Sequence, residues 1–362
     1  MAEPFKNSYN KELIDRIAKA VKIEHKNFDT KLFNETVINN AWESKELKER
    51  MRHIAVSLNT VLDLPFLESL NILTKIANKF NGWAVITFID FVEVYGLEYY
   101  NESVKALGYL TQFSSSEFAV RPFIIKYPDK MMAQMLKWSK DKNHHLRRLS
   151  SEGCRPRLPW AMALPDFKKD PSPIIPILEN LKDDESEYVR KSVANNLNDI
   201  SKDNPCLILD IIRDWKGKSK NTDWILKHGS RTLLKQGNHE ALEIFGVPSK
   251  INMDVLNLRV HKNKIRIGEN NEFSFVIHSK EKNSIKLRLE YFIYYVKSNG
   301  SLSKKIFKIS ETNYAPNERR EILRKISFAD NSIRKHYPGE HKISVVCNGV
   351  EKSSSSFLLL KR

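Results

Sequence analysis

The spacing of apolar and polar residues changes near residue 250 and divides the chain into two regions. Before that point the apolar residues recur at the intervals of an α-helix, as in Leu67, Leu70 and Leu73, and the pattern breaks every ten to twenty residues. After Met253 apolar and polar residues alternate, which is typical of β-strands. The chain is therefore predicted to be mainly α-helical, with a small all-β domain in its last third.

The β region is predicted to contain seven short strands in about 110 residues. Turn signals such as Ser298–Gly300 and Tyr337–Gly339 separate them. Strands of this number and length favour a two-sheet sandwich of immunoglobulin or fibronectin type. Because the sequence lacks the Cys, Trp, Cys pattern of antibody domains, only the architecture is predicted. The predicted strands are Val255–Val260, Phe273–Ile277, Ile285–Val296, Lys305–Ile309, Glu321–Phe328, His341–Val346 and Phe357–Leu360.

The helical region contains a weak internal repeat. Four segments open with an aliphatic residue followed by a base, beginning at Val120, Leu146, Val189 and Leu226. Two of them are followed by a second helix that ends in tryptophan, and we assign both tryptophans, Trp138 and Trp215, to the core. Helix pairs at intervals of about 40 residues indicate a HEAT-like α-superhelical solenoid. Stacking would bring the repeated bases into a stripe that can follow a phosphate backbone.

Charge is distributed unevenly between the two regions. We place the boundary in the linker Gly246–Lys250, so that a helical repeat domain spans 1–250 and an immunoglobulin-like domain spans 251–362. The whole chain has a net charge of +16, and its β domain, with 22 bases and 11 acids, contributes +11. A polyanion is the expected partner, contacted in part through loops such as His261–Arg266 and Ser303–Lys305. A basic surface exposed only to solvent is the alternative.

Other classes of protein are disfavoured. No apolar run reaches the roughly 18 residues of a membrane span, and the first residues lack a secretory signal, so we expect a cytoplasmic monomer with no membrane partner. The three cysteines are predicted to be reduced thiols, and Cys154, beside Arg155, is expected to have a lowered pKa. Glycine-rich nucleotide motifs are absent, and we expect neither a cofactor nor a metal.

The densest cluster of charged residues follows His144. One acid, Glu152, lies among four arginines where a helix gives way to a loop rich in glycine and proline: Arg147, Arg148, Arg155 and Arg157. An ion-pair network that fixes the loop would explain this cluster. Alternatively, the arginines hold DNA phosphates while Glu152 faces a reacting centre that gains positive charge.

A second acid lies near the end of the helix predicted from Glu187. The helical spacing puts Lys191, Asn195 and Asp199 on one polar stripe. Because an aspartate late in a helix opposes the helix macrodipole, its position needs an explanation. A salt link to the next repeat and a catalytic role explain Asp199 equally well.

Three long motifs in the helical region carry a resemblance. They are RRLSSEGCRPRLPW at Arg147–Trp160, YVRKSVANNLNDISKDNP at Tyr188–Pro205 and WILKHGSRTLLKQG at Trp224–Gly237. From about Glu117 to Gly237 the chain resembles the AlkC branch of the HEAT-repeat DNA alkylation repair glycosylases, relatives of AlkD. Its β region is similar to the immunoglobulin-like domain of some AlkC proteins. The resemblance implies excision of the cationic bases N3-methyladenine and N3-methylcytosine from duplex DNA. It also implies that the DNA is kinked around a concave face of the protein, with little enclosure of the damaged base in a pocket.

The matching motifs also imply roles for individual residues. Glu152 would be the principal carboxylate at the lesion, with Glu117 and Asp199 as further acids. Glu117 has an alternative explanation: it lies near the start of a predicted helix, where the helix dipole favours an acid. Trp160 would lie against the cationic base or a neighbouring sugar, unless it is a core residue. The residues expected to bind DNA phosphates are Arg148, Arg155, Arg190, Lys227 and Arg231.

The chemistry of such a lesion suits these residues. An N3-alkylated base is positively charged and departs neutral, so little acid catalysis is needed. A fixed carboxylate can stabilise the oxocarbenium-like sugar and orient a water molecule. The alternative is a non-catalytic HEAT-repeat scaffold that binds nucleic acid or an acidic protein. Glu152 favours the enzyme, because a carboxylate inside a purely phosphate-binding cluster would repel phosphate.

Overall fold

The computed structural model describes residues 4–248, 250–331 and 334–362, so Ser249 of the predicted linker lies outside the described residues. The chain forms two compact units. Unit 1 contains the residues up to Asn204 together with Trp215–Gly229, and unit 2 contains Pro205–Asp214 and Ser230–Arg362. None of the described helices is both long and apolar enough to span a membrane.

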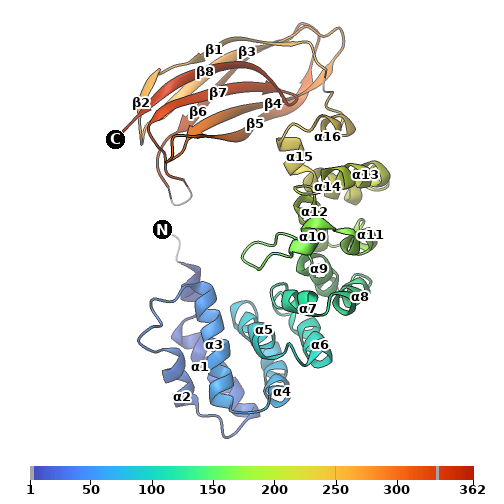
Figure 1. Ribbon diagram of the computed structural model, residues 1–362, viewed down its shortest axis with the longest axis vertical. Coiled ribbons are helices and arrows are strands. Elements are labelled where there is room, and N and C mark those ends of the chain that lie inside the picture. The colour runs from blue at the N-terminus through green and yellow to red at the C-terminus, as the bar shows by residue number, and fades with distance from the viewer. Residues whose placement is uncertain (1–3, 249, 332–333) are drawn as a thin grey trace. The chain divides into compact units, whose positions relative to one another are not determined.

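Unit 1 is a curved stack of helices, as predicted (Figure 1). Helices α3, α5, α7, α9 and α12 lie on the inner side of the curve, and α4, α6, α8 and α11 lie on the outer side. The repeat openings found in the sequence fall in or at the start of α7, α9, α12 and α14. The helices are α1 Lys11–Glu24, α2 Thr30–Val37, α3 Leu47–Leu62, α4 Phe66–Ile76, α5 Trp83–Tyr95, α6 Tyr100–Leu110, α7 Val120–Lys126, α8 Pro128–Trp138, α9 His144–Gly153, α10 Pro165–Lys169, α11 Ile175–Leu181, α12 Glu187–Ile200 and α14 Lys220–Gly229.

Close packing of α9 fixes its end against α7. A Cβ atom on Gly153, the last residue of α9, would lie 2.6 Å from Cγ2 of Val120, so a glycine is needed at this contact. Trp138 and Trp215 are 7% and 4% exposed, which confirms their assignment to the core. The end of α9 is therefore held tightly at the point where the charged cluster of the sequence begins.

Unit 2 combines short helices with a two-sheet sandwich (Figure 1). A three-stranded sheet has the order β1-β3-β6, and a five-stranded sheet has the order β2-β8-β7-β4-β5. The helices are α13 Pro205–Trp215, whose last residue is in unit 1, α15 Arg231–Lys235 and α16 His239–Ile244. The strands are β1 Met253–Val260, β2 Lys264–Arg266, β3 Asn270–Ser279, β4 Ile285–Val296, β5 Leu302–Tyr314, β6 Arg319–Ser327, β7 Gly339–Cys347 and β8 Val350–Leu360.

The seven predicted strands all occur, and the structure adds an eighth. Lys264–Arg266, which the sequence placed in a loop, forms β2 and pairs with β8 in parallel. Its central residue, Ile265, is 2% exposed and joins the sandwich core. A three-residue strand is too short for an alternation to be recognised. Ser303–Lys305, also predicted as a loop, lies in β5, which is longer than its apolar residues indicated.

Candidate functional site: an ion-pair network between two helices

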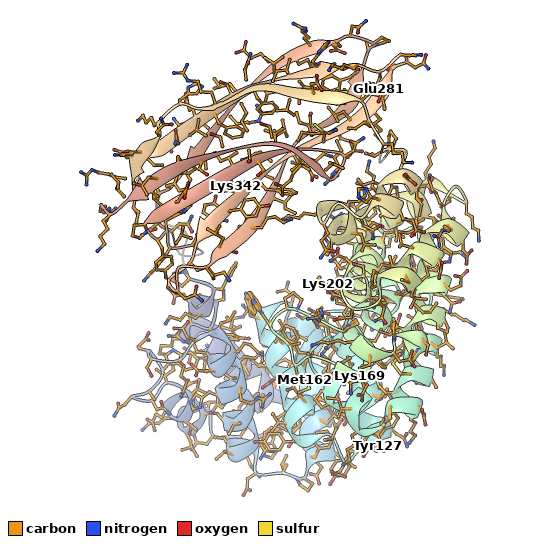
Figure 2. All side chains as sticks on the ribbon, turned by 45° about the horizontal axis from the view of Figure 1, so that its top comes forward. Tyr127, Met162, Lys169, Lys202, Glu281 and Lys342 are labelled. Carbon is orange, nitrogen blue, oxygen red and sulfur yellow. The ribbon has the colours of Figure 1, made fainter. Side chains whose placement is uncertain are left out.

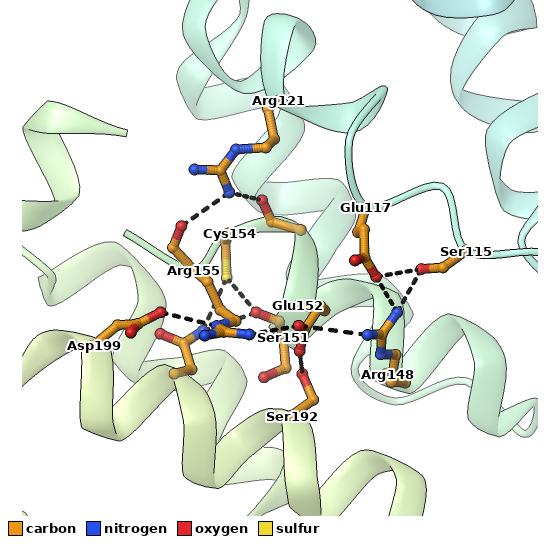
Figure 3. Close-up of polar contacts among 12 residues, drawn as sticks. Ser115, Glu117, Arg121, Arg148, Ser151, Glu152, Cys154, Arg155, Ser192 and Asp199 are labelled. Atoms are coloured by element: carbon orange, nitrogen blue, oxygen red, sulfur yellow. Dashed lines mark hydrogen bonds and ion pairs between the residues drawn. The ribbon is translucent and has the colours of Figure 1, made fainter. Parts of the chain in front are cut away.

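The acids predicted to be functional meet in one alternating network of charges. Figure 3 shows the order Glu117, Arg148, Glu152, Arg155 and Asp199, with each acid next to an arginine. The network joins the segment before α7 to α9, and α9 to the neighbouring inner helix α12. The three carboxylates are thus brought together from positions as far as 82 residues apart in the sequence.

Glu152 is at the centre of the network and is 5% exposed. Its Oε1 accepts a hydrogen bond from Nη1 of Arg155 at 2.6 Å and lies 3.4 Å from Nη2 of Arg148. Its Oε2 accepts a hydrogen bond from the Ser192 hydroxyl on α12 at 2.6 Å. Arg148 is four residues before Glu152 and Arg155 is three residues after it, so both lie on the same side of the chain as Glu152 near the end of α9. The carboxylate is therefore fixed in orientation from three directions.

Asp199 is 2% exposed and is neutralised by two cations. Nε of Arg155 donates to its Oδ2 at 2.9 Å, and Nζ of Lys202 donates to its Oδ1 at 3.0 Å. These bonds explain how an acid is accommodated at the C-terminal end of α12, where the helix dipole disfavours it. The prediction of a salt link to the next repeat was wrong in its direction, because Arg155 lies in the loop after α9 and precedes α12 in the chain. The catalytic role of Asp199 stays a prediction.

Glu117 is the most accessible of the three acids, with 16% of its side chain exposed. It accepts a hydrogen bond from Arg148, whose guanidinium also contacts the Ser115 hydroxyl. The same guanidinium lies 4.8 Å from the centre of the Tyr188 ring. Burial lowers the pKa of Arg148, but Glu152 and Glu117 more than offset this, so its pKa is raised overall and it remains a cation.

Two of the four arginines predicted around Glu152 lie elsewhere. Arg147 makes two hydrogen bonds to Asp184, at 2.6 and 3.0 Å, and Arg157 makes two to Asp203, at 2.9 and 2.6 Å. Arg147 is five residues before Glu152 and therefore points away from it on the helix. Arg157 lies beyond the end of α9, in the loop that follows.

The predicted thiol pKa of Cys154 was wrong. Cys154 is fully buried, and burial raises the pKa of its thiol to about 12. The guanidinium of Arg155 does not activate it, because that group is bound to Glu152 and Asp199. Instead, the thiol donates to the Ser150 carbonyl oxygen at 3.1 Å.

The loop that follows the network presents Trp160 to solvent. Trp160 is 64% exposed, so it is not a core residue. In Figure 1 the loop between α9 and α10 projects from the inner side of the curve of unit 1, and Figure 2 shows Met162, from this loop, on that side. The predicted contact of Trp160 with a lesion stays a prediction.

The predicted phosphate ligands differ in their surroundings. Arg148 and Arg155 are bound to carboxylates, which favours a role in holding those acids. Arg190 donates to the carbonyl oxygens of Asp184 and Glu185. Lys227 is exposed in unit 1, and Arg231 is partly exposed in unit 2. For all five residues, binding to DNA phosphates stays a prediction.

Sequence reasoning missed the polar residues that support the acids. Ser192 precedes Asp199 by seven residues, which is two helical turns, so the two lie on the same side of α12. The seven-residue interval between Ser192 and Asp199 identifies the side of α12 that carries the site better than the stripe through Lys191 does, because Lys191 is exposed. Among the residues that the structure describes, no group of three or more His, Cys, Asp and Glu side chains is placed to hold a metal ion.

Comparison with known proteins gives two family matches. Residues 106–233 match the model described as "DNA alkylation repair enzyme", and residues 254–361 match "Uncharacterised protein YhaZ, C-terminal Ig-like domain". The chain is 48% identical to uncharacterized protein YhaZ of Bacillus subtilis over 97% of this chain and 98% of that one. It is 36% identical to the alkylpurine DNA glycosylase AlkC of Pseudomonas fluorescens, solved with DNA containing an abasic site analog. That match covers 99% of this chain and 100% of that one, with a TM-score of 0.94.

The first prediction concerns the bridge between α9 and α12. Arg155→Met should lower the free energy of unfolding by about 3–5 kcal/mol, because it leaves two buried carboxylates without their shared cation. Arg157→Met removes an exposed arginine from the same loop and should cost about 1 kcal/mol or less. Urea unfolding of both variants measures the difference. Equal losses would mean that the buried network contributes no more than a surface ion pair.

The second prediction concerns thiol reactivity at pH 8. Cys154 and Cys347 are buried and their pKa values are raised to about 12, so both remain protonated, whereas Cys206 is exposed. Ellman's reagent should modify Cys206 at least about a hundredfold faster than the other two. In Cys206→Ser the fast phase should disappear. A fast phase that persists in this variant would contradict the burial of the other thiols.

Proposed function

The chain belongs to the AlkC-like branch of the DNA alkylation repair family and carries a C-terminal immunoglobulin-like domain, and from this membership we propose that it is a monofunctional DNA glycosylase. Its proposed substrates are the cationic bases N3-methyladenine and N3-methylcytosine in duplex DNA. The proposed reaction is hydrolysis of the N-glycosidic bond, which begins base excision repair. The observation that carries this proposal is the network that fixes three carboxylates, followed in the chain by a loop with an exposed tryptophan.

The carboxylates supply negative charge where the reaction develops positive charge. As the glycosidic bond breaks, its electrons go to the base, which leaves neutral, and the sugar acquires oxocarbenium character. A carboxylate held by fixed hydrogen bonds stabilises this cation without reorganising during the reaction. Water then adds to the sugar carbon and loses a proton to solvent or to a carboxylate. Selectivity for cationic bases follows, because a neutral base is a much poorer leaving group.

The geometry supports a division of roles among the acids. A carboxylate offers about four acceptor directions, and Glu152 uses three, for Arg148, Arg155 and Ser192. One direction is left for a water molecule or for the sugar. Glu117 is the more exposed acid and is suited to approach the lesion nucleotide. Asp199 is the most buried, and its proposed contribution is through the electric field that it adds beside Arg155.

Unit 2 is proposed to bind DNA phosphates through a basic cluster on and beside β5. The pKa of Lys305 is lowered by burial and by repulsion from Arg334 and Lys235. Three cations are therefore close enough to interact, which is unfavourable unless an anion approaches. A phosphate would relieve this repulsion and release counterions on binding.

The third prediction tests Glu152. Glu152→Gln should reduce the single-turnover rate of N3-methyladenine release by at least about a hundredfold, because the amide cannot supply negative charge. Affinity for the same duplex should change by less than about threefold, since Gln can still accept from Arg155. Glu187→Gln, which changes an exposed glutamate of α12, is the matched control and should retain activity. Release of free base is measured by chromatography, and thermal unfolding verifies that each variant is folded.

Two results would reject this function. Unchanged excision by Glu152→Gln would remove this residue from the proposed mechanism. If the unmodified protein releases no base from methylated DNA at any concentration but still binds it, the non-catalytic scaffold is favoured. In that case the network would serve only to join α9 to α12.

The fourth prediction tests the basic cluster of unit 2. The double substitution Lys235→Ala and Lys305→Ala removes two of these three cations and should weaken DNA binding. It should also reduce the slope of log K against log salt by about 0.9 for each phosphate that the variant no longer neutralises. Lys282→Ala with Lys352→Ala removes the same charge from exposed positions in the β3–β4 turn and in β8. This control should leave the slope nearly unchanged. Equal slopes for both double variants would mean that β5 does not bind DNA.

A further inference from the structure

Trp160 has an unfavourable backbone conformation. Its φ is 65°, in the left-handed region that a bulky side chain rarely adopts. Its indole is also 64% exposed, so packing of the side chain does not explain this conformation. Such strain persists only where surrounding contacts enforce it, and it is concentrated at functional sites. The contacts that hold the backbone of the Trp160 loop, residues 154–164, therefore need to be identified.

The loop has few contacts of its own that could impose this conformation. Its internal backbone hydrogen bonds include Leu164 N to Pro156 O at 3.2 Å and Ala161 N to Leu158 O at 3.4 Å. Both are longer than the usual 2.9–3.0 Å. The stronger restraints come from two cations outside the loop.

Arg121, on α7, is the first of these cations. Its side chain is fully buried, and its Nε donates to the Met162 carbonyl oxygen at 2.6 Å. Its Nη1 donates to the carbonyl oxygens of Gly153 and Arg155, at 2.9 Å each. One guanidinium thus ties the beginning of the Trp160 loop to the residue two positions after Trp160.

Lys48, on α3, is the second cation, and it contacts Trp160 directly. Its Nζ donates to the Trp160 carbonyl oxygen at 2.6 Å, across 112 residues of sequence. The same ammonium lies 5.5 Å from the centre of the Phe118 ring, next to Glu117 in the chain. Lys48 therefore joins an N-terminal helix to both the Trp160 loop and the segment that carries Glu117.

We infer that Lys48 is a positioning residue that, together with Arg121, holds the strained backbone at Trp160 and so keeps the indole exposed in the loop that follows the carboxylate network. The inference deepens the proposed function and rests on it, because it assigns the Trp160 loop to contact with the lesion. It also gives the N-terminal helices a role in the site. A lysine is suited to this position because its charged donor binds a carbonyl oxygen strongly while its long stem reaches across from α3.

The restraint itself can be tested in the DNA-free protein. Substitution of Arg121 would strip three carbonyl oxygens of their donor and endanger folding, so the test uses Lys48, which is exposed. In Lys48→Met, amide hydrogen exchange at Ala161 and Leu164 should be roughly tenfold faster than in the unmodified protein. Lys48→Arg retains a charged donor and should restore protection. Lys105→Met removes an exposed lysine from α6 in the same unit and should leave these amides unchanged.

Excision kinetics test whether the restraint acts through Trp160. Lys48→Met should reduce the single-turnover rate of N3-methyladenine release roughly threefold to tenfold, and Lys48→Arg should largely rescue it. In a Trp160→Ala background, Lys48→Met should cause no further loss. The salt dependence of DNA binding should be the same with and without Lys48.

Each contrary result has a separate meaning. Unchanged exchange at Ala161 and Leu164 in Lys48→Met would overturn the inference. An equal loss of activity in the Trp160→Ala background, with a salt slope smaller by about 0.9, would make Lys48 a direct phosphate ligand and also overturn it. If the unmodified protein releases no base, the proposed function fails, whereas the hydrogen-exchange result still decides whether Lys48 restrains the loop.

Discussion

The sharing of one guanidinium by two buried carboxylates is the constraint on which the candidate site depends. Glu152 and Asp199 lie on different helices and are almost fully removed from water, which costs several kcal/mol for each unpaired ion. Arg155 contacts both and can do so because its donors are arranged in a rigid fork. The packing of α9 on α12 and the ionisation of the two acids are therefore coupled. A shift of either helix would separate Arg155 from one of its two acids.

Much of the architecture could be predicted from local patterns, because helix and strand periodicities are properties of neighbouring residues. The paired helices and the seven longer strands follow from those periodicities. The three-residue strand β2 does not, because its pairing with β8 depends on residues about 95 positions away. For the same reason the contact of Lys48 with Trp160 could not be foreseen. No local spacing relates residues 112 positions apart.

The acids of the site could be predicted more readily than their partners. Glu152 was recognisable because it is the single acid among four arginines, but two of those arginines pair with other acids. Helical intervals distinguish the arginines that pair with Glu152 from those that pair with other acids, since only arginines three or four residues from Glu152 share its side of the helix. For Cys154, proximity to Arg155 in the sequence predicted the wrong direction of the pKa shift. Burial and the orientation of a side chain decide that direction, and neither can be read from adjacent residues.

The balance of charge in the network resolves a conflict in the proposed chemistry. A site that stabilises a cationic sugar needs negative charge, whereas a protein that binds a polyanion needs positive charge at its surface. Here the carboxylates of Glu117, Glu152 and Asp199 are offset by Arg148, Arg155 and Lys202, so the network as a whole adds little net repulsion toward phosphate. At short range, however, an individual carboxylate still dominates the field that an adjacent group experiences. Since that field depends on distances of a few ångströms, the orientation of each acid and of the loop beside it matters more than the net charge of the chain.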